Sequence, residues 1–155
     1  QSRPRQCQTG DLDEDGADEV IVTHWNEQGC NYELDPNACP WNTITLLHAE
    51  PSQAPTGFDL EIAHPVGKLP WAVELVDMDD DGFLDVVTAN AAGGDVSVLH
   101  GDGEGWFTSE TRIDTGAAGG YPAYMSVEDL NDDGVYDFVI TRPDNQAVSV
   151  VVSTN

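Results

Sequence analysis

Basic side chains are scarce in this sequence. Only five of its 155 residues are Lys or Arg, whereas 29 are Asp or Glu, so the formal net charge is −24. Such a surface repels nucleic acid phosphates and anionic lipids, and we expect neither as a partner. A solvated acidic surface suited to a salty habitat would have this composition, and so would a protein with many carboxylate metal ligands. The clustering of the acids, described below, favours metal ligation.

Long hydrophobic runs are also missing. The longest are a handful of residues, far short of the ~20 that a membrane-spanning helix needs, so no membrane insertion is expected. The apolar residues lie in short runs rich in Val, Ile, Leu and Thr, which predicts strands rather than disorder. No convincing amphipathic helix pattern occurs. We therefore predict an all-β fold, with residues 1–155 forming one repeat region.

The sequence lacks the common catalytic motifs. No G-x-S-x-G, H-E-x-x-H or P-loop sequence occurs, so we predict no catalytic residue and do not expect an enzyme. His48 and His100 hold equivalent strand ends, which indicates repeat architecture rather than catalysis. Trp71 lies on a predicted strand and Trp106 begins one, so we expect both in the core.

Cysteine is limited to Cys7, Cys30 and Cys39. Cys30 and Cys39 share a polar segment, where a disulfide would close a short loop and imply an oxidising compartment. Two free thiols are the alternative, and a zinc site is less favoured because no CxxC or His pair accompanies them. Cys7 falls where the other repeats place a core side chain, so we expect it to be buried.

An acidic nine-residue segment occurs three times, at residues 11–19, 77–85 and 129–137. Positions 1, 3 and 5 are Asp or Asn in every copy, and position 6 is Gly. Position 2 is apolar, position 9 is Glu or Asp, and a proline stands seven residues before each copy. Chance acidic turns do not explain three copies that share all these features.

Strand patterns flank each acidic segment. Apolar residues alternate before it, which predicts a strand with one buried face. The nearly continuous apolar run after it predicts a strand buried on both faces. A third strand follows in every repeat and a fourth in the first two. The predicted later strands are residues 20–23, 43–48 and 58–63 in the first repeat, 86–89, 95–100 and 106–113 in the second, and 138–141 and 147–152 in the third.

The repeats differ in length because of one insertion. The acidic segments begin 66 and then 52 residues apart, and the segment around Cys30 and Cys39 accounts for the difference. The repeats therefore span about residues 4–69, 70–121 and 122–155, and the last one is incomplete.

The spacing within the acidic segments predicts calcium binding. Ca²⁺ takes about six to eight oxygen ligands at ~2.3–2.6 Å, and short acidic side chains at alternate positions of a tight loop converge on one point. Gly at position 6 permits the sharp turn through a positive φ. The carbonyl at position 7 supplies another oxygen, and the acid at position 9 closes the shell. The predicted ligands are Asp11, Asp13, Asp15, Ala17 and Glu19 in the first loop, Asp77, Asp79, Asp81, Phe83 and Asp85 in the second, and Asp129, Asn131, Asp133, Val135 and Asp137 in the third.

Up to three Ca²⁺ ions would change the formal charge from −24 to −18. Ions that bind only the folded loops stabilise the fold by mass action. We therefore expect chelation to loosen or unfold the chain.

These features resemble the FG-GAP/VCBS repeat family, the repeats of integrin-α-type β-propellers. Residues 70–88 carry the resemblance, and residues 95–107 are similar to the family's third strand, glycine-rich turn and aromatic start of the fourth strand. The resemblance implies four-stranded blades around a central axis, with calcium in the loop joining the first two strands. The chain would then hold two full blades and a three-stranded partial blade. It would be a piece of a longer propeller, or a ring completed by other copies of itself.

The resemblance implies a secreted or cell-surface binding or adhesion module that calcium stabilises. Its partners would be an extracellular protein or glycan, with self-association through open blade edges. The alternatives are an accessory or catalytic part of a secreted polysaccharide-degrading enzyme and a structural surface or filament subunit. Tyr32 and Trp41 border the cysteine segment and are the predicted ligand surface, with a merely decorative loop as the alternative. No secretory signal is visible, and one removed by processing is compatible with the sequence.

Overall fold

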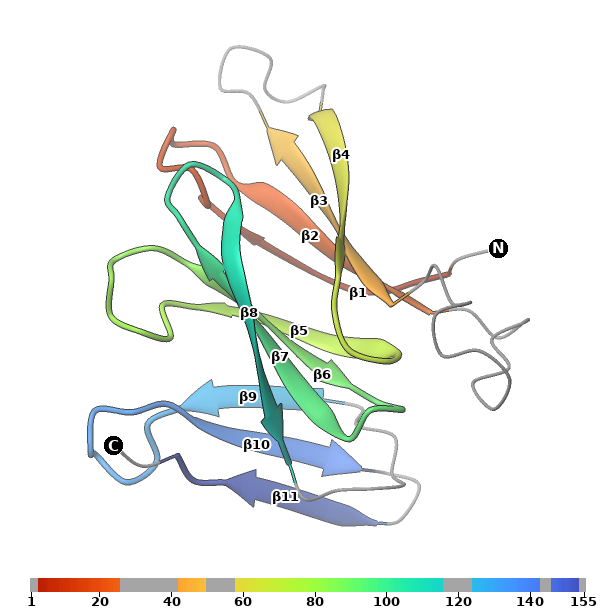
Figure 1. Cartoon of the computed structure of the whole chain (residues 1–155), viewed down its shortest axis with the longest axis vertical. Helices are drawn as coiled ribbons and strands as arrows, with labels where there is room; N and C mark the ends of the chain where they lie inside the picture. Colours follow the sequence, from red (N-terminus) through yellow and green to blue (C-terminus); the bar gives the residue numbers. More distant parts are fainter. Residues whose placement is uncertain (1–2, 26–41, 50–57, 116–123, 143–145, 154–155) are drawn as a thin grey trace.

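The computed structural model describes residues 3–25, 42–49, 58–115, 124–142 and 146–153. These residues form three antiparallel sheets that are stacked in chain order (Figure 1). The described part contains no helix long and apolar enough to cross a membrane. The strands are β1 (Arg3–Gly10), β2 (Glu19–Trp25), β3 (Thr43–Ala49), β4 (Phe58–Pro65), β5 (Pro70–Val76), β6 (Asp85–Asn90), β7 (Asp95–Gly101), β8 (Phe107–Asp114), β9 (Tyr124–Glu128), β10 (Asp137–Arg142) and β11 (Ala147–Val151).

Each sheet is a meander in which every strand pairs with the next along the chain. The orders are β1-β2-β3-β4 for the first sheet, β5-β6-β7-β8 for the second and β9-β10-β11 for the third. The all-β prediction is therefore confirmed. Within the described residues, each predicted strand is present, and the third sheet has the three strands that the sequence indicated.

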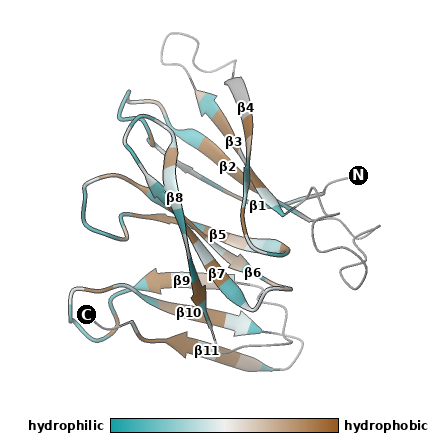
Figure 2. Ribbon diagram, viewed as in Figure 1, coloured by the Kyte–Doolittle hydropathy of each residue, from teal (hydrophilic) through white to brown (hydrophobic). Residues whose placement is uncertain are grey.

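The acidic loops join the first strand of each sheet to the second, and all three project from one side of the stack (Figure 1). Hydrophilic residues dominate this side, whereas hydrophobic residues occupy the middles of the strands (Figure 2). The repeated sequence therefore places its acids together at one side of the molecule.

Two apolar layers hold the three sheets together. Ile21, Leu46 and Val86 belong to the layer between the first and second sheets. Val87 and Phe138 belong to the layer between the second and third. The neighbours Val86 and Val87 on β6 point to opposite layers, so the middle sheet is covered on both faces, as its continuous apolar run predicted. Full burial of each such side chain contributes roughly 1.5–3 kcal/mol.

Cys7 is exposed, so the prediction of a buried cysteine is wrong. Its counterparts Val73 and Met125 are buried because each packs against the preceding sheet. No described sheet precedes the first one, so the corresponding face of β1 meets solvent. The opposite face of β1 carries Gln6, whose side-chain amide donates a 3.1 Å hydrogen bond to the carbonyl of Val73.

The expectation that Trp71 and Trp106 lie in the core is also wrong for Trp106, which is 46% exposed. Trp106 belongs to the turn between β7 and β8, and its ring lies 6.0 Å from that of His48 in the first sheet. The next residue, Phe107, packs against the apolar layer in its place. Trp71 is partly buried, with the Arg5 guanidinium 3.6 Å from its ring centre.

Two predictions concern residues outside the described part of the chain. They are the Cys30–Cys39 disulfide and the ligand surface at Tyr32 and Trp41. Both stay predictions.

Glu74 provides a test of burial between the first two sheets. It lies on β5, accepts a 3.1 Å hydrogen bond from the Gln8 amide, and has its pKa raised by burial. Because folding disfavours the charged form, ionisation lowers the free energy of unfolding as the pH rises through the raised pKa, and the cost is absent well below the ordinary pKa. Glu74→Gln is therefore expected to stabilise the metal-free chain at pH 7 by less than about 1 kcal/mol.

The measurement is denaturant unfolding at pH 7 and at about pH 3.5, where the two proteins should be equally stable. Glu128→Gln, at an exposed position on β9, controls for the change in net charge. A gain from Glu74→Gln that is the same at both pH values would contradict the assignment.

Candidate metal centres

The three acidic loops share one pattern of internal hydrogen bonds. The two carboxylate oxygens of Asp77 accept the N–H groups of Asp81 at 3.1 Å and Gly82 at 2.9 Å. Asp11 and Asp129 each accept the same pair of bonds in their own loops. The acid at position 5 then accepts the N–H of position 7 in all three copies. Each loop is thus folded around its own acids.

Two left-handed residues tighten each loop. The glycines at position 6 have positive φ, as predicted, with values of 91° at Gly16, 98° at Gly82 and 82° at Gly134. The acid at position 4 is also left-handed, with φ of 57° at Glu14, 58° at Asp80 and 59° at Asp132. The sequence did not reveal the role of position 4, because an acid there resembles one more potential ligand. The signal was available, since Asp tolerates this conformation better than most residues.

The side chains at positions 1, 3 and 5 converge. In the first and second loops, one carboxylate oxygen from each of these positions lies within 4.8 Å of the other two. A cation at about 2.3–2.6 Å from each oxygen fits this spacing, and an oxygen-only donor set is the kind that Ca²⁺ prefers. The structure therefore brings these three predicted ligands of each loop together.

The third loop differs at position 3. The Asn131 side-chain oxygen accepts the N–H of Asp133 at 2.9 Å, and its amide nitrogen donates to the Asp133 carboxylate at 3.0 Å. The N–H groups around Asp129, with that of Gly134 first, hold its pKa below the usual range. The loop thus keeps an oxygen at position 3 while losing one charge. The predicted carbonyl ligands at position 7, Ala17, Phe83 and Val135, stay predictions.

The acid at position 9 has a structural task that the sequence did not reveal. Asp85 is fully buried and accepts the N–H of Met78 in the loop at 2.9 Å and the N–H of Gly101 at the end of β7 at 2.8 Å. Glu19 and Asp137 make the same two bonds in the other sheets. This carboxylate therefore fastens each loop to the third strand of its sheet.

Burial raises the pKa of both Glu19 and Asp85, against the lowering effect of the backbone N–H groups that they accept. One carboxylate oxygen of each lies within 4.8 Å of an oxygen of the acid at position 3. Neither acid belongs to the convergent group that positions 1, 3 and 5 form. Their predicted ligation of the loop cation stays a prediction.

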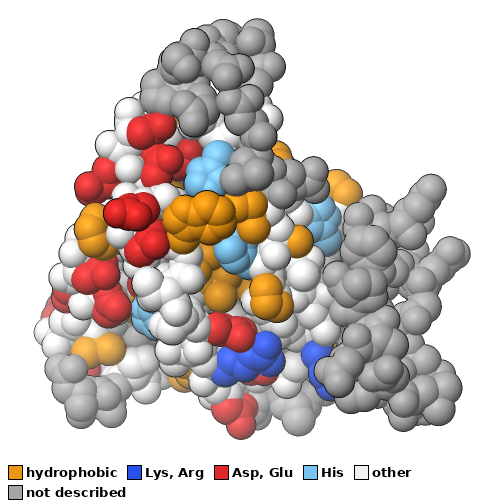
Figure 3. Space-filling model, turned by 45° about the horizontal axis from the view of Figure 1, so that its top comes forward, with side chains coloured by type: hydrophobic (Ala, Val, Ile, Leu, Met, Phe, Trp, Pro, Cys, Tyr) orange, Lys and Arg blue, Asp and Glu red, His pale blue; other side chains and the backbone are white. Residues whose placement is uncertain are grey.

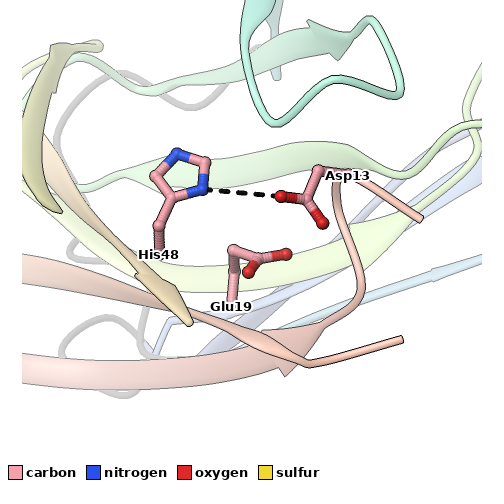
Figure 4. Close-up of side chains that lie close together, drawn as sticks. All are labelled: Asp13, Glu19 and His48. Atoms are coloured by element: carbon pink, nitrogen blue, oxygen red, sulfur yellow. Dashed lines mark ion pairs between the residues drawn. The ribbon is translucent and has the colours of Figure 1, made fainter. Parts of the chain in front are cut away.

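Histidines complete this neighbourhood in two of the sheets. His100 Nδ1 lies 3.3 Å from an Asp79 oxygen, and His48 Nδ1 lies 3.9 Å from an Asp13 oxygen (Figure 4). Figure 3 shows acidic side chains gathered on one flank of the surface, with histidine beside them. The shared position of the two histidines was visible in the sequence, but their approach to the acids depends on how the third strand returns to the loop.

A hollow of about 270 Å³ lies near the starts of the first strands, at the end opposite the acidic loops. Arg5, Gln6, Trp71 and Tyr124 line it. They come from β1, β5 and β9, one first strand of each sheet. Sequence reasoning missed this group because its members are far apart in the chain.

The position-9 acid can be tested by substitution. Asp85→Ala leaves the N–H groups of Met78 and Gly101 without their acceptor, so we expect the metal-free chain to lose about 2–4 kcal/mol of unfolding free energy. Asp80→Asn is the matched control, because it removes one charge from the exposed rim of the same loop. Denaturant unfolding measures both, and equal stability of the two variants would contradict the fastening role.

The part of the chain that is similar to a known protein family contains two of the acidic loops. The sequence profile described as FG-GAP-like repeat matches residues 69–140, which include the whole of the second and third acidic loops. No curated protein is significantly similar in sequence. The similarity to the FG-GAP-like repeat family thus lies in residues 69–140, and it is the family that the sequence had indicated.

Proposed function

We propose that this chain is a calcium-stabilised binding module of the β-propeller type, that it acts outside the cell or at its surface, and that it is not an enzyme. One observation carries the proposal. Three loops with the same hydrogen bonds lie at one side of three stacked sheets, and in the first two loops the carboxylate oxygens of positions 1, 3 and 5 converge. The family is that of the FG-GAP-like repeats, which suggests a module that binds rather than reacts.

Calcium would act as a structural ion. Each loop connects two strands of a sheet, and the acid at position 9 connects the loop to the third strand. An ion held by positions 1, 3 and 5 would therefore restrain three of the strands in a sheet at one point. It would also relieve repulsion among carboxylates in a chain of net charge −24. Because the ion binds only the folded loop, it adds to stability by mass action.

The stacked sheets correspond to successive blades in this proposal. The first two have four strands each and the third has three, and each sheet packs on the next through an apolar layer. A piece of a longer propeller and a ring completed by other copies both fit this arrangement. In either case the outer face of the third sheet receives a further sheet.

The hollow at the starts of the first strands is the proposed place for an extracellular ligand, a glycan or a protein. Trp71 and Tyr124 offer aromatic faces, and Gln6 and Arg5 offer hydrogen-bond donors. This combination suits a sugar ring, which has apolar faces and a polar rim. Arg5 lies over the Trp71 ring, which holds the indole in place.

Self-assembly is the second candidate function. Val148 and Val150 on β11, with Val152 just after it, are 62%, 53% and 52% exposed and lie on the outer face of the third sheet. β11 is also the edge strand of that sheet within the described residues. An exposed apolar edge strand promotes association with another sheet.

Calcium titration by calorimetry tests the main proposal. The full chain is expected to bind three Ca²⁺ ions, and a chelator is expected to lower its melting temperature. Asp79→Ala should remove one of the three sites, because Asp79 supplies an oxygen to the second group while, among the described residues, no loop N–H depends on it.

Asp80→Asn, the adjacent acid, should keep all three sites and serves as the charge control. Calcium binding that is absent in the wild-type chain, or equally reduced by both substitutions, would overturn the calcium proposal.

Glycan-array binding in calcium tests the ligand site. Tyr124→Ala is expected to abolish any glycan binding, and it should leave the fold intact because the side chain is 71% exposed. Val148→Ala, exposed on the same sheet, should have no effect. Glycan binding that survives Tyr124→Ala would place the ligand elsewhere.

Solution mass tests self-assembly. In calcium at physiological salt, where repulsion between acidic chains is screened, we expect a mass above that of the monomer by light scattering. Val150→Asp should return the chain to a monomer without lowering its melting temperature, whereas Thr108→Asp, at an exposed site on β8, should not. A chain that is monomeric in all conditions would rule out this candidate.

A further inference from the structure

Beside two of the acidic loops, the fold brings together one histidine and two carboxylates. In the second sheet these are Asp79 from the loop, Asp85 at the start of β6 and His100 near the end of β7. One ligand atom from each lies within 4.8 Å of the other two. The first sheet repeats the set with Asp13, Glu19 and His48 (Figure 4). The grouping is not a cluster of acids alone, since a different strand contributes a nitrogen donor.

The spacing in the second sheet is that of ligands around one small ion. His100 Nδ1 lies 3.3 Å from Asp79 Oδ2 and 3.6 Å from Asp85 Oδ2. This nitrogen is buried and has no hydrogen-bond partner. Nitrogen–oxygen separations of 3.3 and 3.6 Å are those of donor atoms about 2.0–2.2 Å from a common centre, which are the bond lengths of Zn²⁺ to imidazole nitrogen and carboxylate oxygen.

The other nitrogen of the ring is held in a way that suits a ligand. His100 Nε2 lies 3.2 Å from the hydroxyl oxygen of Thr111 on β8. When Nε2 carries the proton and donates it to Thr111, Nδ1 keeps its lone pair facing the two carboxylates. Histidines that bind metals are commonly oriented by such an outer hydrogen bond.

We propose that Asp79, Asp85 and His100 bind a divalent transition-metal ion such as Zn²⁺, at a position separate from the calcium loop. Imidazole nitrogen is a poor ligand for Ca²⁺ and a good one for Zn²⁺. The oxygen donors of the loop therefore favour Ca²⁺, whereas the set that includes His100 favours Zn²⁺. Asp79 has two oxygens and can serve both positions. Each Asp85 oxygen keeps a second lone pair beyond the backbone bond that it accepts. The site shares Asp79 with the proposed calcium loop, and it also shares Asp85, the predicted closing ligand of that loop, but it does not require calcium to be bound there.

Solvent can reach this position. The Asp79 side chain is 47% exposed and that of His100 is 21%, so water can complete the coordination. In the first sheet the separation of His48 and Asp13 is 3.9 Å, and the two side chains are only 14% and 22% exposed. Gly105 lies close to His48 there, since any side chain at Gly105 would collide with the imidazole ring. We therefore infer a stronger site in the second sheet and a weaker one in the first.

The third sheet supplies an internal comparison. Counted from the acidic loop, Val152 stands where the second sheet has His100. The third loop can therefore offer oxygen ligands alone. Calcium sites should number three, whereas transition-metal sites should number two.

Cobalt titration of the full, calcium-saturated chain tests the proposal. A Cys7→Ser background removes the exposed thiol as a competing ligand. Visible absorption of Co²⁺ and calorimetry are expected to show one strong and one weaker site. His100→Val, which installs the residue of the third sheet, should lower the affinity of the strong site by about tenfold to 100-fold or more. His48→Val should affect only the weaker site, and Asp80→Asn should affect neither.

His100→Gln is a second variant that keeps a polar side chain, and retention of all calcium sites verifies that each variant is folded. Unchanged Co²⁺ binding in both His100 variants, or full displacement of Co²⁺ by Ca²⁺, would overturn the proposal. A chain that binds Co²⁺ through His100 but binds no Ca²⁺ would support this site and overturn only the calcium proposal.

Discussion

The rest of the structure depends on a buried carboxylate at position 9 of each acidic loop. Asp85 accepts one N–H from its loop and another from the end of β7, so a single side chain fixes the loop against the third strand. Glu19 and Asp137 do the same in their sheets. A buried N–H without an acceptor costs about 1–3 kcal/mol. The loop therefore keeps its position only when the third strand of the sheet is in place.

That arrangement creates an electrostatic problem. The buried acid lies beside another acid at position 3, and burial raises the pKa of Glu19 and of Asp85. These two neighbourhoods and the third loop, which has Asn131 at position 3, face the same side of a chain with net charge −24 (Figure 1). The proposed cations would relieve this repulsion, because a bound cation neutralises the acids without removing the hydrogen bonds that hold each loop.

Stacking of the sheets explains which side chains are buried and which are not. Val73 and Met125 are covered because each faces a preceding sheet, whereas Cys7, at the same position in the first sheet, is exposed. Tyr124, at the start of β9, is 71% exposed and lines the hollow with Arg5, Gln6 and Trp71. The two outer faces of the stack and the hollow at the strand starts are thus the surfaces that remain for partners, while the acidic loops occupy the other end.

The sequence by itself determined the strands, the three loops and the oxygen-bearing side chains at positions 1, 3 and 5, because period-two alternation and a fixed loop spacing are local properties. It also indicated the repeat family that residues 69–140 match. It could not place Cys7 or Trp106, since their exposure depends on which sheet lies next to them. Only the tertiary structure decided that Asp85 bonds to a strand end 16 residues away and that His100 meets Asp79. Contacts between separate strands are set by register and stacking, which no local pattern encodes.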